Sequence, residues 1–231
     1  MALVTKKSGN GFFLKINSKE GCVQHREKGE DGETLKDGEG KAVVIKHRPG
    51  MTSIVGVLRD VEIIENEYEG NKTQALRLRM DDIAEGEPTM FVDLPFSSDE
   101  SGASFFGLQV MGKLNAGDIT KPFSLTPWFM KEGHKSKGHE PLKKSKSGCV
   151  VTQTGADGVD VKLAPDFGNG LKELPELSEV MIGKKAVKNK DEWDKISVAL
   201  FDIIWTKLHP DEKKVETPAL AKQEAKKPSK K

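Results

Sequence analysis

A lysine-rich segment between two strand-like runs contains the residues best suited to bind a charged ligand. It spans residues 131–146 and holds six lysines, two histidines and only two acids. Such dense ammonium groups repel one another and are stabilised by a polyanion, and the preceding Trp128 and Phe129 offer rings that can stack on bases. The composition predicts a nucleic-acid-binding loop, and the alternative is a solvated surface loop. The lysines are Lys131, Lys135, Lys137, Lys143, Lys144 and Lys146.

Charge is segregated along the chain. The 231 residues include 37 basic and 36 acidic side chains, a formal net charge of +1. Residues 60–100 hold twelve acids against three basic residues, whereas residues 131–146 carry a net +4 and residues 209–231 a net +3. A protein with separate basic patches is suited to presenting one face to a polyanion rather than coating it indiscriminately.

Catalytic and metal-binding motifs are weak by comparison. Hard cations bind clustered carboxylates, and a magnesium site would use Asp81, Asp82, Glu85 and Glu87. Adjacent acids on a strand point to opposite faces, which argues against that site. A zinc site would combine Cys22 and His25 with His134 and either His139 or Cys149, although its ligands lie in distant segments. We therefore expect a protein that is not an enzyme, has no cofactor or metal, and keeps its two cysteines as buried thiols.

The elements that must position the candidate residues are mainly strands. Period-two alternation and turn residues predict strands at 12–16, 42–47, 53–64, 73–81, 89–94 and 123–130, and a hairpin at 149–163. The glycine-rich and charged residues 18–41 favour a long flexible loop or hairpin. Apolar stripes at helical spacing predict helices at 101–114 and 191–208.

Alternation also assigns side chains to faces. In the strand at 73–81, Leu76, Leu78 and Met80 point inward, so Arg77 and Arg79 point outward. In the next strand Phe91 falls on the polar side, where it either stacks on a base or is covered by a neighbouring loop. Trp128 similarly lies opposite the more apolar face of its strand, which contains Phe123 and Phe129.

The element order from residue 53 to 163 predicts a particular barrel. Three strands, a helix and two further strands follow one another, as in the OB-fold. We expect a mainly β protein with helices, whose OB-fold five-stranded barrel core occupies residues 53–165. N-terminal strand extensions occupy 1–52, a linker and a C-terminal amphipathic helix 166–208, and a disordered Lys/Ala/Pro tail 209–231. The lysine-rich segment then becomes the loop between the fourth and fifth strands. The loop between the first two strands is acidic and offers only Tyr68 and Lys72.

Two segments resemble a known family. GVLRDVEIIENEYEGNKTQALRLRMDD at 56–82 and FVDLPFSSDESGASFFGLQVMGKLN at 91–115 are similar to bacteriophage OB-fold single-stranded DNA-binding proteins. The resemblance covers roughly residues 12–155 and implies sequence-tolerant binding of single strands in replication, recombination or repair. Such proteins commonly end in an acidic tail that recruits partners. This chain ends in KKPSKK, so its tail is expected to add DNA affinity instead.

The resulting hypothesis is a single-stranded DNA-binding protein that combines base stacking with a basic groove. Possible further partners are replication or recombination proteins, and the oligomeric state is left open. The sequence shows no apolar run long enough for a membrane span or a signal peptide, so we expect a cytoplasmic protein, in the host cytoplasm if phage-encoded. The alternatives are a protein-protein assembly module and a non-specific duplex binder that uses the basic tail. The predicted contacts are Arg77, Arg79, Phe91, Trp128, Tyr68, Lys72 and the six lysines of the segment.

Overall fold

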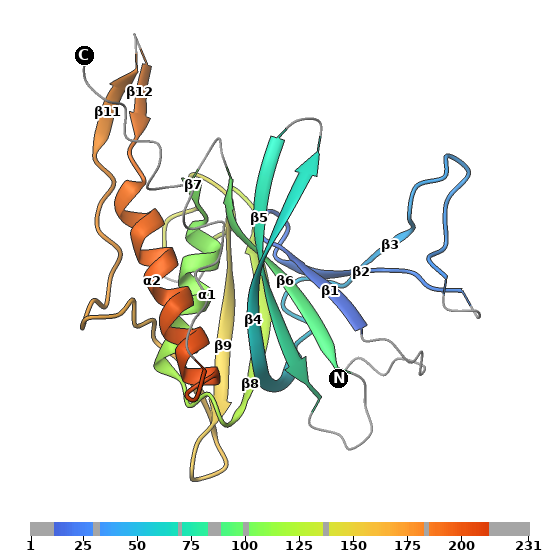
Figure 1. Cartoon of the computed structure of the whole chain (residues 1–231). Helices are drawn as coiled ribbons and strands as arrows, with labels where there is room; N and C mark the ends of the chain where they lie inside the picture. The colour runs from blue at the N-terminus through green and yellow to red at the C-terminus, as the bar shows by residue number, and fades with distance from the viewer. Residues whose placement is uncertain are drawn as a thin grey trace.

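The fold is mainly β, with an open ten-stranded sheet and two helices (Figure 1). The computed structural model describes residues 12–29, 33–68, 71–82, 89–98, 102–135, 139–182 and 185–212. The first strands are β1 (Phe12–Asn17), β2 (Cys22–Arg26), β3 (Val44–Lys46), β4 (Ile54–Tyr68), β5 (Asn71–Asp81), β6 (Met90–Ser98) and β7 (Gly102–Ala103). After them come α1 (Phe105–Ala116), β8 (Pro122–Met130), β9 (Lys146–Thr154), β10 (Asp160–Lys162), β11 (Glu179–Ile182), β12 (Lys185–Lys188) and α2 (Asp191–Leu208).

The large sheet follows the order β10-β9-β8-β4-β5-β6-β1-β2-β3, with β7 also paired to β6. Its ladders are antiparallel except the one between β1 and β6, which is parallel and sets Phe13 opposite Phe91. A separate two-stranded sheet joins β11 and β12. The main sheet therefore brings the N-terminal strand beside β6, although the two are far apart in the sequence.

The expected five-stranded barrel is not confirmed, whereas the mainly β class is. Closing the series β9-β8-β4-β5-β6 into a ring would require β9 to pair with β6. In the described chain β1 lies on that edge of β6, and β9 pairs with β10 on its outer side. Because both edges are already used, the sheet extends through β2 and β3 instead of closing.

The sheet nevertheless curls until its N-terminal part meets β8. The backbone amide of Gly50 donates to the carbonyl oxygen of Pro127 at 2.8 Å, and the Ser147 hydroxyl donates to the carbonyl oxygen of Ser18. At the β1–β2 turn, Gly21 has a φ of +60°, and a Cβ atom there would overlap the carbonyl oxygen of Trp128. Only glycine allows this close approach.

Replacing Gly21 with alanine is therefore expected to destabilise the protein more than the same change at an open turn. A left-handed alanine costs about 1–2 kcal/mol, and the overlap with the backbone of β8 adds about 1–3 kcal/mol. Gly40→Ala is the matched control, since Gly40 has a φ of +78° and nothing within 4 Å of its added Cβ. Urea unfolding measures the loss of unfolding free energy in each of the two variants. Equal losses would show that the turn does not dock against β8.

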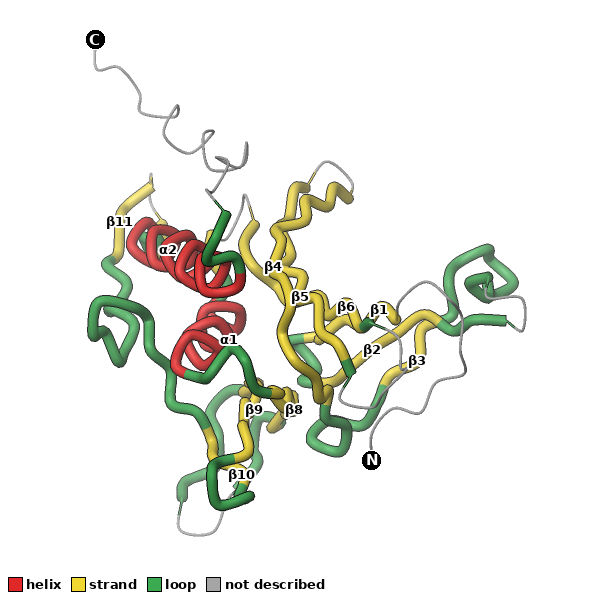
Figure 2. Tube along the Cα trace, turned by 60° about the horizontal axis from the view of Figure 1, so that its bottom comes forward, coloured by secondary structure: helices red, strands yellow, loops and turns green. Residues whose placement is uncertain are grey.

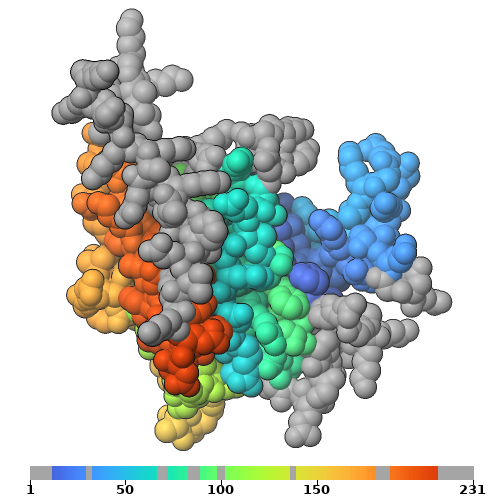
Figure 3. Space-filling view, in the orientation of Figure 1, coloured from blue at the N-terminus to red at the C-terminus, as the bar shows by residue number. Residues whose placement is uncertain are grey.

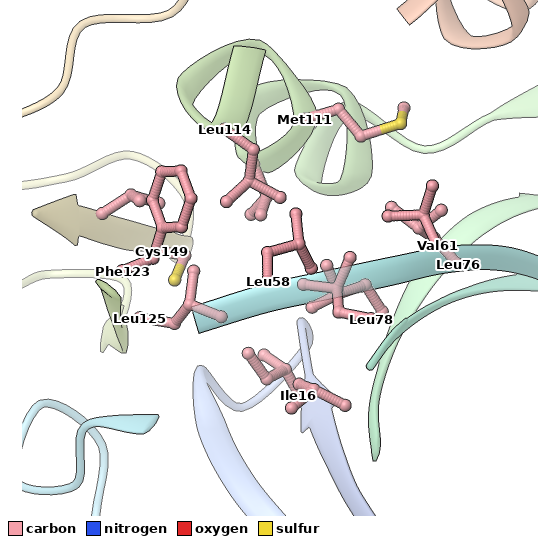
Figure 4. Packing of buried hydrophobic residues seen from close by; sticks show 14 of the residues in the cluster. Ile16, Leu58, Val61, Leu76, Leu78, Met111, Leu114, Phe123, Leu125 and Cys149 are labelled. Atoms are coloured by element: carbon pink, nitrogen blue, oxygen red, sulfur yellow. The ribbon is translucent and has the colours of Figure 1, made fainter. Parts of the chain in front are cut away.

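A single hydrophobic core lies inside the curl. It is built from the inward side chains of the sheet together with one side of each helix. Figure 4 shows Leu58 and Leu78 between Leu114 of α1 and Ile16 of β1. Leu76, Leu78 and Met80 are buried, so the alternation predicted for this strand is confirmed. Its outward side chains are thereby fixed on the opposite face of the sheet.

The two helices pack against each other on one side of the sheet (Figures 1 and 2). The bounds predicted for α2 are confirmed, but α1 begins later than predicted because Gly102 and Ala103 form β7. Asp194 of α2 accepts a hydrogen bond from the Ala103 amide at 2.6 Å, and Lys207 donates to the Asn115 carbonyl oxygen at 2.8 Å. Both ends of α2 are thus attached to the rest of the fold.

Residues 18–41 contain more regular structure than the sequence suggested. They include β2, and isolated bridges join Lys28 to Thr34 and Lys36 to Ala42. The β11–β12 hairpin has no counterpart among the elements predicted from the sequence. The space-filling view shows the N-terminal strands projecting to one side of the molecule (Figure 3). Among the described residues, no helix is long and apolar enough to span a membrane.

Candidate nucleic-acid interface

Two phenylalanines form a stacked pair on the outward face of the sheet. Phe13 of β1 and Phe91 of β6 are direct neighbours in the parallel ladder, and their ring centroids lie 4.8 Å apart with planes 14° from parallel. Their sequence neighbours Leu14 and Val92 are buried in the core, so the stacked rings lie on the other side of the sheet. Phe13 is 51% exposed. The pair therefore offers an aromatic surface to the solvent.

Arg77 of β5 holds this aromatic pair from the side. Its guanidinium carbon lies 5.2 Å from the centroid of the Phe13 ring and 5.9 Å from that of Phe91. Two hydrogen bonds, of 2.7 and 3.0 Å, join the guanidinium to the carboxylate of Asp93 and raise the pKa of Arg77. Because its charge is already paired, Arg77 is better placed to fix the rings than to bind a phosphate.

Two further cations flank the rings without such a partner. Arg79 lies opposite Phe91 in the β5–β6 ladder, and Lys15 lies opposite Asp93 in the β1–β6 ladder. Both side chains are exposed. Neither has a carboxylate of the described chain within 4.0 Å. We call the surface formed by Phe13, Lys15, Arg77, Arg79 and Phe91 the aromatic face.

The predicted basic loop joins β8 to β9. Its described parts fold back on each other: the Gly133 amide donates to the Leu142 carbonyl oxygen at 2.9 Å, and the Leu142 amide to that of His134 at 3.0 Å. The described lysines of residues 131–146 are all exposed, and no ion pair joins them to another described residue. They are Lys131, Lys135, Lys143, Lys144 and Lys146, whereas Lys137 lies outside the described residues.

The other predicted contacts do not join the aromatic face. Trp128 is half-buried, and its ring covers Gly148 so closely that an added Cβ would lie 2.6 Å from it. It belongs to β8, which β4 separates from β5 in the sheet order. Lys72 is exposed at the start of β5. The side chain of Tyr68 lies outside what the structure describes.

Phe13 and Lys15 belong to the aromatic face but are not among the contacts predicted from the sequence. From the sequence, the strand at 12–16 belongs to an N-terminal extension associated with the barrel, and no particular partner strand is predicted for it. Parallel pairing between distant strands leaves no turn signal in the sequence. The alternation of Phe13 and Lys15 with buried Leu14 and Ile16 was the only available indication that they share an outward face.

Some of the residues considered as metal ligands make other contacts. His47 lies 3.1 Å from the His25 ring, and Asp81 accepts a hydrogen bond from Arg59 at 2.8 Å. Both cysteines are buried and free, and burial raises the pKa of Cys149 to about 12. Within the described ranges, no three His, Cys, Asp or Glu side chains are grouped closely enough to hold a metal ion. Glu85 and Glu87 lie outside the described residues.

Comparison of the chain with protein-family models, with curated proteins and with solved structures finds no match. The side chains of the aromatic face and the basic loop therefore carry the functional information in this chain.

Proposed function

We propose that this protein binds single-stranded DNA with little sequence preference and that the aromatic face is its base-binding surface. The observation that carries the proposal is the Phe13–Phe91 stack, which is open to solvent on Phe13. It is flanked by Lys15 and Arg79, two cations with no carboxylate partner among the described residues. Every base has a π-face, so stacking contributes about 1–3 kcal/mol per base whatever the sequence. The adjacent cations are suited to the phosphates on either side of a stacked base.

The same features favour a single strand over a duplex. Bases in a duplex already stack on each other, so they are not available to Phe13 or Phe91. A cross-strand aromatic pair can also serve only to stabilise a sheet. Stabilisation of the sheet alone would not require Lys15 and Arg79, two exposed cations that have no carboxylate partner among the described residues, to lie beside the rings. Arg77 supports the binding role as well, because its ion pair with Asp93 holds it against both rings.

The fold supports the proposal through the order of its central elements. β4, β5, β6, α1, β8 and β9 follow the order of an OB-fold, a fold that binds oligonucleotides on its second and third strands. We infer an elaborated OB-fold in which β1 lies on the edge of β6 that a five-stranded barrel would use to close. In this arrangement β5 and β6 are the second and third strands, and the basic loop connects the fourth and fifth.

A biological role in replication, recombination or repair follows from the resemblance to bacteriophage single-stranded DNA-binding proteins. We propose that the protein protects single strands in the compartment where phage or host DNA is copied. Proteins of replication or recombination would then be its partners. The basic C-terminal residues 213–231 lie outside the described residues, and their contribution to DNA affinity is part of the proposal.

A titration of labelled oligo(dT) and of a duplex of equal length tests the proposal. Fluorescence anisotropy at low and moderate salt should show tighter binding of the single strand, with an affinity that falls as salt rises. Absence of single-strand binding at low salt would reject the proposal. Equal or tighter duplex binding would instead favour a duplex-binding protein, and binding to neither would favour an assembly module.

A further inference from the structure

A groove adjoins the aromatic face at the end where β1 and β6 diverge. It has a volume of about 720 Å³ and lies between the β1–β2 turn, the β4–β5 hairpin, the end of β6 and the start of α1. Lys15 and Asp93 line it and also border the aromatic face, so the two surfaces are continuous. From Phe91 to Ser97, β6 carries this surface over about 20 Å.

The groove has a positive bias. Among the described residues that line it are three lysines, Lys15, Lys19 and Lys190, and one acid, Asp93. That carboxylate is already bonded to Arg77. Lys190 is held in place by a hydrogen bond of 3.2 Å to the carbonyl oxygen of Ala103. The remaining lining is neutral and combines apolar side chains, which can contact bases, with polar ones, which can hydrogen-bond to a hydrated phosphate backbone.

One wall of the groove carries an exposed aromatic ring on a rigid support. Phe105, the first residue of α1, is 53% exposed. Its ring centroid lies 5.6 Å from that of Trp193 in α2. The Trp193 indole is fixed in turn by a hydrogen bond of 2.9 Å to the carbonyl oxygen of Pro175. A phenylalanine supported in this way can stack on a base without losing much side-chain freedom.

We propose that this groove is a second subsite for the same DNA strand, with a base on Phe105 and neighbouring phosphates near Lys19 and Lys190. The inference rests on the proposed function, because it extends the path of the strand that starts on the aromatic face. The proposed ligand is a DNA strand long enough to contact both the aromatic face and the groove. A short oligonucleotide needs only the aromatic face, whereas a longer one gains the contacts of the groove.

Binding of oligo(dT) at two lengths, about 4 and about 12 nucleotides, tests the subsite. The full-length variant Phe105→Leu with Lys19→Ala should weaken binding of the longer oligonucleotide about tenfold and leave the shorter one unchanged. Leucine keeps an apolar side chain against Trp193, and Lys19 is exposed, so the fold is expected to persist. Lys162→Ala on β10 is the matched control for the lost charge, and Lys19→Ala alone serves if the double variant melts early.

The outcomes separate the two proposals. If the unmodified protein binds neither length, both proposals are overturned. The Phe105→Leu, Lys19→Ala double variant is the groove variant. If Phe91→Ala weakens binding of both oligonucleotides while the groove variant binds them as the unmodified protein does, single-strand binding stands and the second subsite is rejected. A groove variant that weakens both lengths equally also rejects it, because the groove would then belong to the primary site. Loss confined to the longer oligonucleotide supports it.

Discussion

Replacing both Phe13 and Phe91 with alanine should weaken oligo(dT) binding by about thirtyfold or more. Each stacked base contributes about 1–3 kcal/mol, and 1.4 kcal/mol corresponds to a factor of ten, so losing two stacking partners removes at least about 2 kcal/mol. The loss should be almost independent of salt, because no charge changes. Anisotropy titrations over a range of salt concentrations measure both the size of the loss and its salt dependence.

The double variant Phe13→Leu with Phe91→Leu is the control for packing. Leucine preserves apolar contact between β1 and β6 but removes the π-faces, so its affinity should fall nearly as far as that of the alanine variant. Thermal melting shows whether either variant loses the β1–β6 ladder. If the leucine variant binds oligo(dT) as tightly as the unmodified protein, the aromatic face does not stack on bases.

The part of this face that lies on β5 and β6 could be predicted from sequence because local alternation determines it. Leu76, Leu78 and Met80 identify the buried side of β5, and Arg77 and Arg79 follow on the other side. The same reasoning places Phe91 outward on β6. These assignments need only a period of two within one strand, and they hold whatever the rest of the chain does.

The pairing of β1 with β6 could not be predicted in the same way. A parallel partner is not joined by a short turn, so no local residue pattern specifies it. Without this ladder the sequence offers a single aromatic, Phe91, where the structure has a stacked pair with Phe13. The same ladder explains why the sequence favours a five-stranded barrel where the structure has an open sheet.

Arg77 shows how register changes the role of a residue. From the sequence it is an outward cation and a candidate phosphate contact. In the structure it lies directly opposite Asp93 on β6, and the two side chains form a bidentate pair. Alternation gives the face of each residue but not its neighbour across the ladder. The cations of the face that have no carboxylate partner in the described part of the chain are consequently Arg79 and Lys15, and of these only Arg79 is a contact predicted from the sequence.

Removing three lysines of the basic loop should change the salt dependence of binding. A single strand releases about 0.7 counterions for each phosphate that is neutralised. If Lys143, Lys144 and Lys146 each contact one phosphate, the triple alanine variant should flatten the log-log salt slope by about 2. Over the tenfold range from about 1 M to about 0.1 M salt, this amounts to about a hundredfold loss of affinity at the lower concentration.

A variant with the same net charge separates local contacts from overall electrostatics. Lys36, Lys162 and Lys195 are exposed and lie outside the basic loop, so their triple alanine variant removes the same charge elsewhere. It should leave the slope nearly unchanged. Equal flattening in both variants would mean that only net charge matters, and no flattening in either would place the phosphate contacts away from the loop. Stacking and charge affect the plot of log affinity against log salt concentration differently. The Phe13→Ala, Phe91→Ala variant should lower the affinity by the same factor at every salt concentration, whereas the triple lysine variant of the loop should change the slope.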